Sequence, residues 1–206
     1  MIAVVDYGMG NLRSVQKALQ RAGGDAAIVR RKSDVARAQK IVLPGVGAFG
    51  QAMVRLREQG LVAPLLEAAR GGRPFLGICL GFQLLFDVSY EGGEWRGLGV
   101  FPGKVIRFEF GPGSALRVPH MGWNGLKWDR PCPLLEGVAA GAHVYFAHSY
   151  HVVPAEAAIV CTTTDYGGPF VSSVWKGNVF ATQFHPEKSQ AVGLRMLENF
   201  VRLQGV

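Results

Sequence analysis

The sequence predicts an α/β fold with an open, mostly parallel central sheet flanked by helices, and an additional β-rich antiparallel portion in the C-terminal half. In the first half, short apolar runs alternate with helical patterns, which is typical of parallel strands joined by covering helices. After residue 90 the pattern changes to β-rich segments separated by turn residues. The chain has 206 residues and no segment that resembles a linker, so we expect a single domain over residues 1–206.

The elements of the first half each have a local signal. Residues 1–6 are a buried apolar run, and residues 12–22 form a helical pattern with Asn11 as a suitable N-cap and Gly23 as a stop. The apolar runs DAAIVR, KIVLP and PFLGI predict three further strands. Helices are expected over residues 49–70, with a break near Gly60, and over residues 80–86.

The second half is expected to consist mainly of antiparallel strands. The segments GLGVFPGKVIRFEF, HVYFAHSYHVVP, AAIVCTTTDYG and FVSSVWKGNVFATQFH are β-rich, and Lys176-Gly177-Asn178 is a good hairpin turn. An amphipathic helix over about residues 191–203 closes the chain.

Composition limits the classes of function. The formal net charge is +7, from 22 Lys and Arg less 15 Asp and Glu, but the basic residues are dispersed and accompany no nucleic-acid motif, so we expect no nucleic-acid partner. Arg13, Lys17 and Arg21 recur every four residues, which predicts a stripe on one helix face, either solvated or docking an acidic partner.

Localisation is expected to be cytoplasmic. The three cysteines are odd in number and scattered, which argues against a disulfide framework and favours a reducing compartment. The start, MIAVVDYG, resembles a core strand and not a signal peptide, and no apolar run reaches membrane-spanning length.

Cys79 lies in an unusual frame, the segment GICLGFQ at residues 77–83. Free cysteines mostly behave as small buried hydrophobes. Here, however, glycines flank the residue two positions away on each side, as in a sharp strand-to-helix turn that holds a nucleophile exposed. A helix beginning at Leu80 would favour the thiolate through its dipole.

A thiol nucleophile needs a base and a group that orients the base. Among five histidines, His185 stands at the end of a predicted strand, where catalytic side chains emerge in open α/β sheets. Pro186 favours an extended His185, and residues two apart in an extended chain point the same way, so Glu187 can sit beside the imidazole. Alone, His-Pro-Glu would indicate only a strand ending in a turn; together with the Cys79 frame it favours a catalytic triad.

Oxyanion donors have two candidate sources. The backbone N–H of Leu80 follows the nucleophile, and the loop at Gly45, Val46 and Gly47 could supply a second donor, although an ordinary Pro-Gly loop fits that pattern equally well. Gln83 lies one helical turn after Cys79 and can face the same cleft.

These residues resemble the triad-type (class I) glutamine amidotransferases. The resemblance rests on GICLGFQ, FHPEK and PGVG and implies hydrolysis of the glutamine side-chain amide, with Cys79 attacking the γ-carbonyl, His185 as base, Glu187 orienting it and Gln83 binding substrate. The segments DYGMGNLRSV, LPGVGAFG, PHMGWN, YFAHSY and HPEKSQ are similar, over essentially the whole chain, to the glutaminase subunits of imidazole glycerol phosphate synthases.

The resemblance to that branch implies a heterodimer with a (β/α)₈ cyclase subunit, in which ammonia is passed on to make imidazole glycerol phosphate and the aminoimidazole carboxamide ribotide in histidine biosynthesis. It also implies that backbone groups of residues 148–150 bind glutamine, that partner contacts involve a small set of residues, and that the oxyanion donors are misplaced until the partner is loaded. The substrate segment is His148, Ser149 and Tyr150, and the partner set is Asn11, Trp123, Tyr145 and Lys188.

No cofactor or metal is expected, because His148 and His151 lie three apart on a predicted strand and so on opposite faces. Two alternatives stay open: the glutaminase of another synthase, such as one for aminated chorismate products, or a non-catalytic scaffold on the same fold. HPEKSQ and HMGWN favour the imidazole glycerol phosphate branch, and the complete Cys79, His185 and Glu187 set argues against a scaffold.

Overall fold

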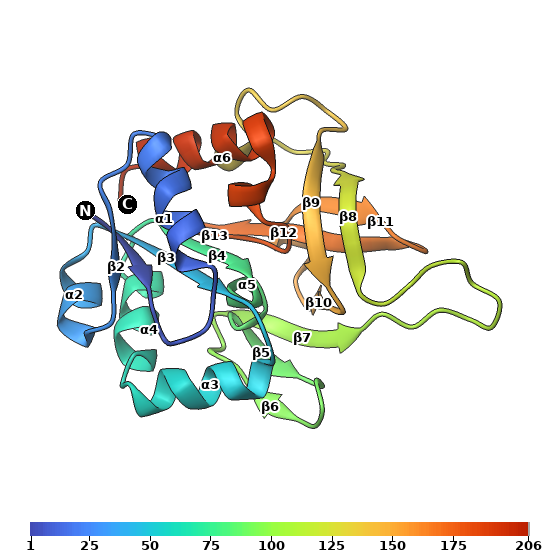
Figure 1. The fold of residues 1–206 in the computed structure, drawn as a ribbon, viewed down its shortest axis with the longest axis horizontal. Coiled ribbons are helices and arrows are strands. Elements are labelled where there is room, and N and C mark those ends of the chain that lie inside the picture. Colours follow the sequence, from blue (N-terminus) through green and yellow to red (C-terminus); the bar gives the residue numbers. More distant parts are fainter. Residues whose placement is uncertain (206) are drawn as a thin grey trace.

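The computed structural model describes residues 1–205 and is built on one sheet of 11 strands, with a second sheet of two strands beside it (Figure 1). The strand order of the large sheet is β2-β1-β3-β4-β13-β12-β10-β7-β5-β6, and β11 pairs with β12 off this path. The five strands β2, β1, β3, β4 and β13 run parallel to one another. The predicted fold class, a mostly parallel sheet with an antiparallel C-terminal portion, is confirmed.

The parallel half follows the apolar runs of the sequence. Residues of β1, β4 and β13 are buried on both faces, as expected where helices cover both sides. The strands are β1 (Ile2–Val5), β2 (Ala26–Val29), β3 (Lys40–Gly45), β4 (Phe75–Cys79) and β13 (Val179–Thr182).

Helices cover the two faces of this half and divide its core in two. On one face α1 (Leu12–Arg21) packs against α6 (Gln190–Arg202), and on the other α2 (Lys32–Arg37) packs against α4 (Val62–Arg70), beside α3 (Phe49–Glu58). Alternate side chains of β1 enter the two cores: Val4 joins the α1 and α6 side, and Val5 the α3 and α4 side.

The antiparallel half extends the sheet through β12, which forms the predicted hairpin with β13; Gly177 supplies the positive φ of the turn. Its strands are β5 (Phe86–Ser89), β6 (Trp95–Arg96), β7 (Phe101–Arg107), β10 (Tyr150–Pro154), β11 (Val160–Asp165) and β12 (Pro169–Lys176). The small sheet pairs β8 (His120–Gly125) with β9 (His143–His148). Short 3₁₀ turns are η1 (Pro133–Leu135), η2 (Ala157–Ile159) and η3 (Pro186–Lys188).

Several local predictions were wrong. The helix α2 was not foreseen, and the helix expected over 80–86 ends after one turn as α5 (Leu80–Gln83), because Phe86 enters a strand that pairs with β7. The segment HVYFAHSYHVVP is two strands in different sheets, divided at Ser149. Asn11 occupies the N-cap position of α1 but makes no side-chain capping bond.

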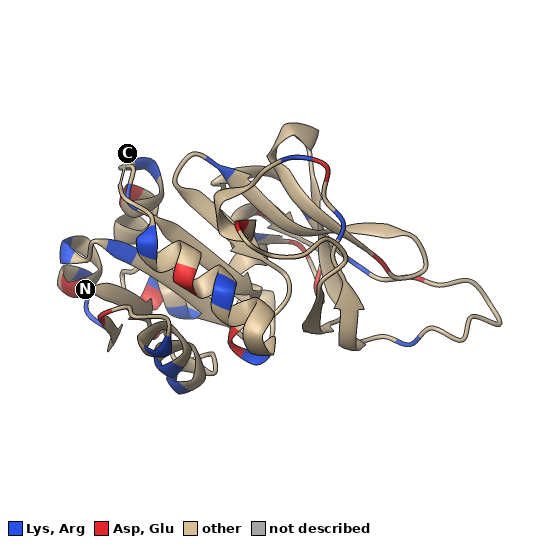
Figure 2. Cartoon of the chain, turned by 90° about the horizontal axis from the view of Figure 1, so that it is seen from above, with Lys and Arg blue, Asp and Glu red and all other residues tan. Residues whose placement is uncertain are grey.

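Lys and Arg residues are distributed over both halves of the fold and are interspersed with acidic residues (Figure 2). Arg13, Lys17 and Arg21 are exposed on α1, as the four-residue spacing predicted. Within residues 1–205, none of the helices combines the length and the hydrophobicity needed to cross a bilayer.

Candidate active site

Cys79 is the last residue of β4 and directly precedes α5. Its backbone has φ 55° and ψ −108°, a region that L-residues rarely adopt, and its side chain is buried, with 6% exposed. The following turn leaves no space for a larger residue at Gly81, where a Cβ atom would collide with the carbonyl oxygen of Leu43. The turn is therefore as sharp as the glycine spacing predicted, and Cys79 carries backbone strain.

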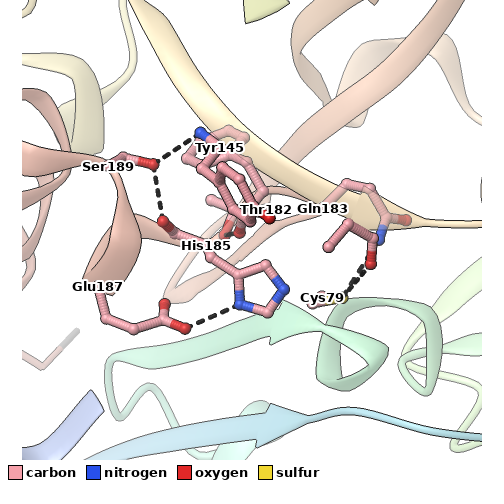
Figure 3. A network of polar contacts seen from close by, with 9 residues as sticks. Cys79, Tyr145, Thr182, Gln183, His185, Glu187 and Ser189 are labelled. Carbon is pink, nitrogen blue, oxygen red and sulfur yellow. Dashed lines mark hydrogen bonds and ion pairs between the residues drawn. The ribbon is translucent and has the colours of Figure 1, made fainter. Parts of the chain in front are cut away.

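His185 and Glu187 form a buried pair beside Cys79. His185 Nδ1 donates to Glu187 Oε1 at 2.8 Å, and the two side chains are 4% and 1% exposed. Figure 3 shows the other ring nitrogen facing Cys79. The contact between His185 and Glu187 was predicted for an extended chain, but Pro186 begins the 3₁₀ turn η3, which turns Glu187 back toward the ring.

The pKa of His185 reflects opposing effects. Burial lowers it, while hydrogen bonds to Cys79 and Glu187, together with the negative charges of both groups, raise it, and the net result is a pKa of about 10. This direction means that the site favours a protonated imidazole whenever the thiolate and the carboxylate are both charged.

The backbone of His185 is fixed by a network that links it to β9 (Figure 3). The Ser189 hydroxyl donates to the His185 carbonyl at 2.7 Å and accepts from the Tyr145 N–H at 3.0 Å. The His185 N–H donates to the Tyr145 carbonyl at 2.9 Å. These bonds fix the His185 backbone relative to β9 of the small sheet.

A pocket of about 200 Å³ opens at Cys79, large enough for a small amino acid side chain. It gathers most of the residues that the sequence assigned to substrate and oxyanion binding. The pocket is lined by Cys79 with Val46, Gly47, Leu80, Gln83, His148, Ser149 and Tyr150, and also by Glu91, Pro119, Met121 and Ala147.

Gly45 lies at the base of the site and pairs with Cys79 across β3 and β4. A Cβ atom there would collide with the hydroxyl of Tyr7, which is fully buried and has no hydrogen-bond partner among the described residues. Burial and the negative charge of Cys79 raise the pKa of this hydroxyl. Next along the chain, Val46 is 43% exposed and Gly47 has φ +102°, so the predicted oxyanion loop leaves the sheet directly beside the nucleophile.

The His148 imidazole is tied into a buried histidine pair. Its Nδ1–H donates to the Tyr150 carbonyl at 2.8 Å, so its Nε2 accepts from His120 Nδ1 at 3.1 Å. Burial lowers the pKa of His148 to about 3 and that of His120 to about 4. Both rings are thus neutral and mutually bonded, and His148 contributes to the pocket as a wall. Within the described chain, no group of three His, Cys, Asp or Glu residues is arranged to hold a metal ion.

Three of the four residues predicted at a partner interface lie together beside His185. Trp123 and Tyr145 are cross-strand neighbours with ring centroids 6.1 Å apart, and Lys188 Nζ lies 5.7 Å from the Tyr145 ring. Trp123 is 47% exposed, and Met121 on the same face of β8 is 64% exposed. Asn11 is exposed at the start of α1, a helix that packs against η3.

Residues 3–203 match the protein family described as "Glutamine amidotransferase class-I". Proteins described as "Imidazole glycerol phosphate synthase subunit HisH" are similar over nearly the whole chain. The protein from Syntrophotalea carbinolica is 54% identical, and the matched region covers 97% of this chain and 98% of that protein. The protein from Aquifex aeolicus is also 54% identical, with 97% of this chain and 95% of that protein covered. The chain belongs to the HisH family of class-I glutamine amidotransferases.

Solved structures of lower identity share the fold of this class-I amidotransferase. A "Crystal structure of glutamine amidotransferase" superimposes with a TM-score of 0.75 at 23% identity and covers 98% of this chain and 100% of its own. The "Structure of PurLQS from Thermotoga maritima" gives 0.76 at 21% identity, covering 97% and 96%. The resemblance inferred from the sequence motifs is therefore confirmed at the level of family and fold.

Three residues of this site were assigned no role from the sequence. Glu91 and Met121 line the pocket, and Gln183 contacts Cys79, with its Nε2 atom 3.7 Å from Cys79 Sγ. Gln183 lies two residues before His185 and is fully buried, and a polar residue directly after a buried apolar strand was the available signal.

Proposed function

We propose that this chain hydrolyses glutamine to glutamate and ammonia with Cys79, His185 and Glu187, and delivers the ammonia to a cyclase subunit of an imidazole glycerol phosphate synthase. The observation that carries the proposal is a strained, buried Cys79 facing a buried His185–Glu187 pair at a pocket of about 200 Å³. The HisH proteins that this chain resembles are named as subunits of that synthase, which supports the choice of partner.

In the proposed reaction, the Cys79 thiolate attacks the γ-carbonyl carbon of glutamine and the oxygen becomes an oxyanion. The imidazolium of His185 gives its proton to the leaving nitrogen, the C–N bond breaks, and ammonia and a γ-glutamyl thioester result. Water then attacks the thioester while His185 accepts one of its protons. The C–S bond breaks, glutamate is released, and the thiolate is restored.

Backbone donors stabilise the oxyanion in this proposal. Leu80 is the first residue of α5, so its N–H has no carbonyl partner within the helix. The exposed loop at Val46 and Gly47 supplies the second donor, and loss of one such donor costs on the order of 10²–10³ in rate. Because Gly47 has a positive φ, we expect this loop to change conformation when the loaded partner binds.

The partner surface is assigned to Met121, which lines the pocket, and to the neighbouring group of Trp123, Tyr145 and Lys188. Two large exposed hydrophobic side chains with a neighbouring cation are typical of an interface anchor. A cyclase seated there covers the exit of the pocket, so that ammonia reaches it without protonation in bulk water. With three unpaired cysteines and this biosynthetic role, we place the protein in the cytoplasm.

The test is glutamate release from glutamine by the purified chain, alone and with the cyclase subunit and its nucleotide ligand. We expect a near-silent chain that is activated in the complex, and complete loss with Cys79→Ala, while ammonia-dependent cyclase activity persists. The matched control is Cys161→Ala, a buried cysteine in β11, which should retain activity. Equal activity with and without this cyclase would reject the partner, and no activity or glutamine binding in any mixture would favour a scaffold.

A further inference from the structure

Gln183 directly follows β13, and its side chain contacts both Cys79 and Gln83, two residues that line the pocket. Its side chain is fully buried; Nε2 is 3.7 Å from Cys79 Sγ, and Oε1 is 3.0 Å from Gln83 Nε2. Its backbone N–H donates to the Ser172 carbonyl at 2.8 Å, which fixes the direction of the side chain. A buried amide in contact with a nucleophile has no role in the triad described above.

The orientation of the Gln183 amide follows from its neighbours. Gln83 Nε2 lies 2.9 Å from the Tyr150 carbonyl, which can only accept a hydrogen bond, so Gln83 must present its NH₂ group there. The second N–H of that NH₂ group points to Gln183, whose facing atom must therefore be the oxygen. The NH₂ group of Gln183 is left to face Cys79 Sγ, and an inverted amide would place two donors against each other.

We propose that Gln183 is a catalytic residue whose N–H donates a hydrogen bond to the Cys79 thiolate, held in this sense by Gln83 and the Tyr150 carbonyl. The inference deepens the proposed function and rests on it for the nature of the reaction. A hydrogen bond to the charged form favours that form, so the amide stabilises the thiolate before attack. It does so again when the C–S bond of the thioester breaks and the electron pair returns to sulfur.

Other groups around the sulfur define what the amide adds. His185 carries the proton that pairs with the thiolate, and Glu187 supports His185 from η3. Tyr7, two residues after β1, and the neutral His148 on β9 also lie within electrostatic range of this cluster. The Ala147 carbonyl, 4.0 Å from Sγ, is an acceptor and suits only the protonated thiol. Gln183 is thus a neutral donor whose effect does not depend on its own titration.

The first experiment measures the pH profile of alkylation of Cys79 by iodoacetamide, followed by mass analysis of the peptide that carries it. Gln183→Met keeps the length of the side chain but has no N–H donor. We expect the midpoint of the profile to move upward by about one pH unit, which corresponds to roughly tenfold slower alkylation below the midpoint. An unchanged midpoint in a folded Gln183→Met protein would overturn the proposal.

The control is Thr182→Val, the preceding residue in β13. Its hydroxyl is buried and donates to the Phe184 carbonyl at 3.0 Å, so the variant removes a buried hydrogen bond from the same strand without touching the sulfur. We expect its midpoint to equal that of the unmodified protein. An equal upward shift in Thr182→Val would mean that loosening of the strand, and not the amide donor, controls the thiol.

A measurement on the unmutated chain covers the case in which Gln183→Met does not fold. With ¹⁵N-labelled glutamine side chains, the NH₂ resonances of Gln183 should shift with the midpoint found by alkylation, and those of the exposed Gln51 should not. NH₂ resonances of Gln183 that do not shift over the pH range in which Cys79 titrates would overturn the proposal. The expected alkylation and NMR response, with no glutamate release even in the complex with the cyclase and its nucleotide ligand, would instead reject the proposed function and leave the hydrogen bond established.

Discussion

The strained backbone of Cys79 allows a prediction about stability that does not depend on activity. A non-glycine residue with φ 55° and ψ −108° costs on the order of 1–3 kcal/mol. Cys79→Ala keeps the Cβ atom and the strain, whereas Cys79→Gly removes both. Comparing the two variants therefore measures how much free energy the fold stores at the nucleophile.

The comparison needs a buried control with ordinary strand geometry, and Ala3 in β1 provides it, since it is fully buried. At Ala3, a change to Gly loses about 0.8 kcal/mol of Cβ burial and about 0.5–1 kcal/mol of backbone entropy, so we expect about 1.5 kcal/mol of destabilisation. At position 79 the same costs are offset by relief of strain. The Ala-to-Gly cost at position 79 should then be smaller than at Ala3 by about 1–3 kcal/mol.

The assay is urea unfolding of Cys79→Ala, Cys79→Gly and Ala3→Gly, with a check that the slope on denaturant is unchanged. For a domain of this size, each kcal/mol corresponds to about 2–4 °C in Tm, which gives a second readout. If glycine at position 79 costs as much as glycine at Ala3, the fold does not impose strain on the nucleophile, and the reasoning from φ and ψ is refuted.

Three further predictions concern the charge, the acid stability and the docking of the site. Glu187→Gln keeps a hydrogen-bond acceptor for the His185 ring but removes the negative charge of the carboxylate. The pKa of His185, measured by NMR, should therefore fall, and glutamate release should drop by roughly 10²–10⁴-fold. An unchanged rate would exclude Glu187 from catalysis. Burial lowers the folded-state pKa values of His120 and His148 to about 4 and 3, so below about pH 6.5 the unfolded chain binds more protons than the folded one. The free energy of unfolding, measured with urea at each pH, should therefore fall from about pH 6.5 toward about pH 4. A free energy of unfolding that does not change over this range would show that the pair is not buried as neutral rings. Trp123→Ala should weaken cyclase binding by about tenfold or more without changing Cys79 alkylation, and equal affinity in a binding titration would remove Trp123 from the interface.

The parallel half could be predicted from the sequence because its signals are local and agree with one another. Short apolar runs, helical spacing and the glycine at position 23 favour the same element boundaries, although these signals did not predict α2. Gly23 has φ +85° at the end of α1, as a helix stop requires. Local agreement of this kind needs no knowledge of partners across the fold.

The errors fall where distant segments decide the local structure. The run LGFQLLF is apolar apart from Gln83, and periodicity cannot distinguish a buried helix from a buried strand in so short a run. Phe86 becomes a strand residue because β7 offers it a partner more than ten residues later. Similarly, the division of YFAHSY at Ser149 exists because β9 pairs with β8 while β10 pairs with β7 and β12.

The triad shows both a success and a limit of sequence reasoning. Pro186 does keep His185 extended, with φ −101° and ψ 97°, but it also begins a 3₁₀ turn, so Glu187 reaches the ring by a different path from the one expected. No sequence motif predicted a role for Gln183, because its contact with Cys79 depends on the pairing of two strands that lie about a hundred residues apart in sequence.

That pairing explains why the candidate site forms at the carboxyl ends of the central strands β3, β4 and β13. In β4 and β13, Ile78 pairs with Thr182, so the next residues of the two strands, Cys79 and Gln183, arrive side by side. In β3 and β4, Gly45 pairs with Cys79 and brings the oxyanion loop to the same edge. Because successive residues of a strand point to opposite faces, a shift of β13 by one residue would turn the Gln183 amide away from the sulfur. The parallel registers of three neighbouring strands therefore bring together Cys79, Gln183 and the loop at residues 45–47.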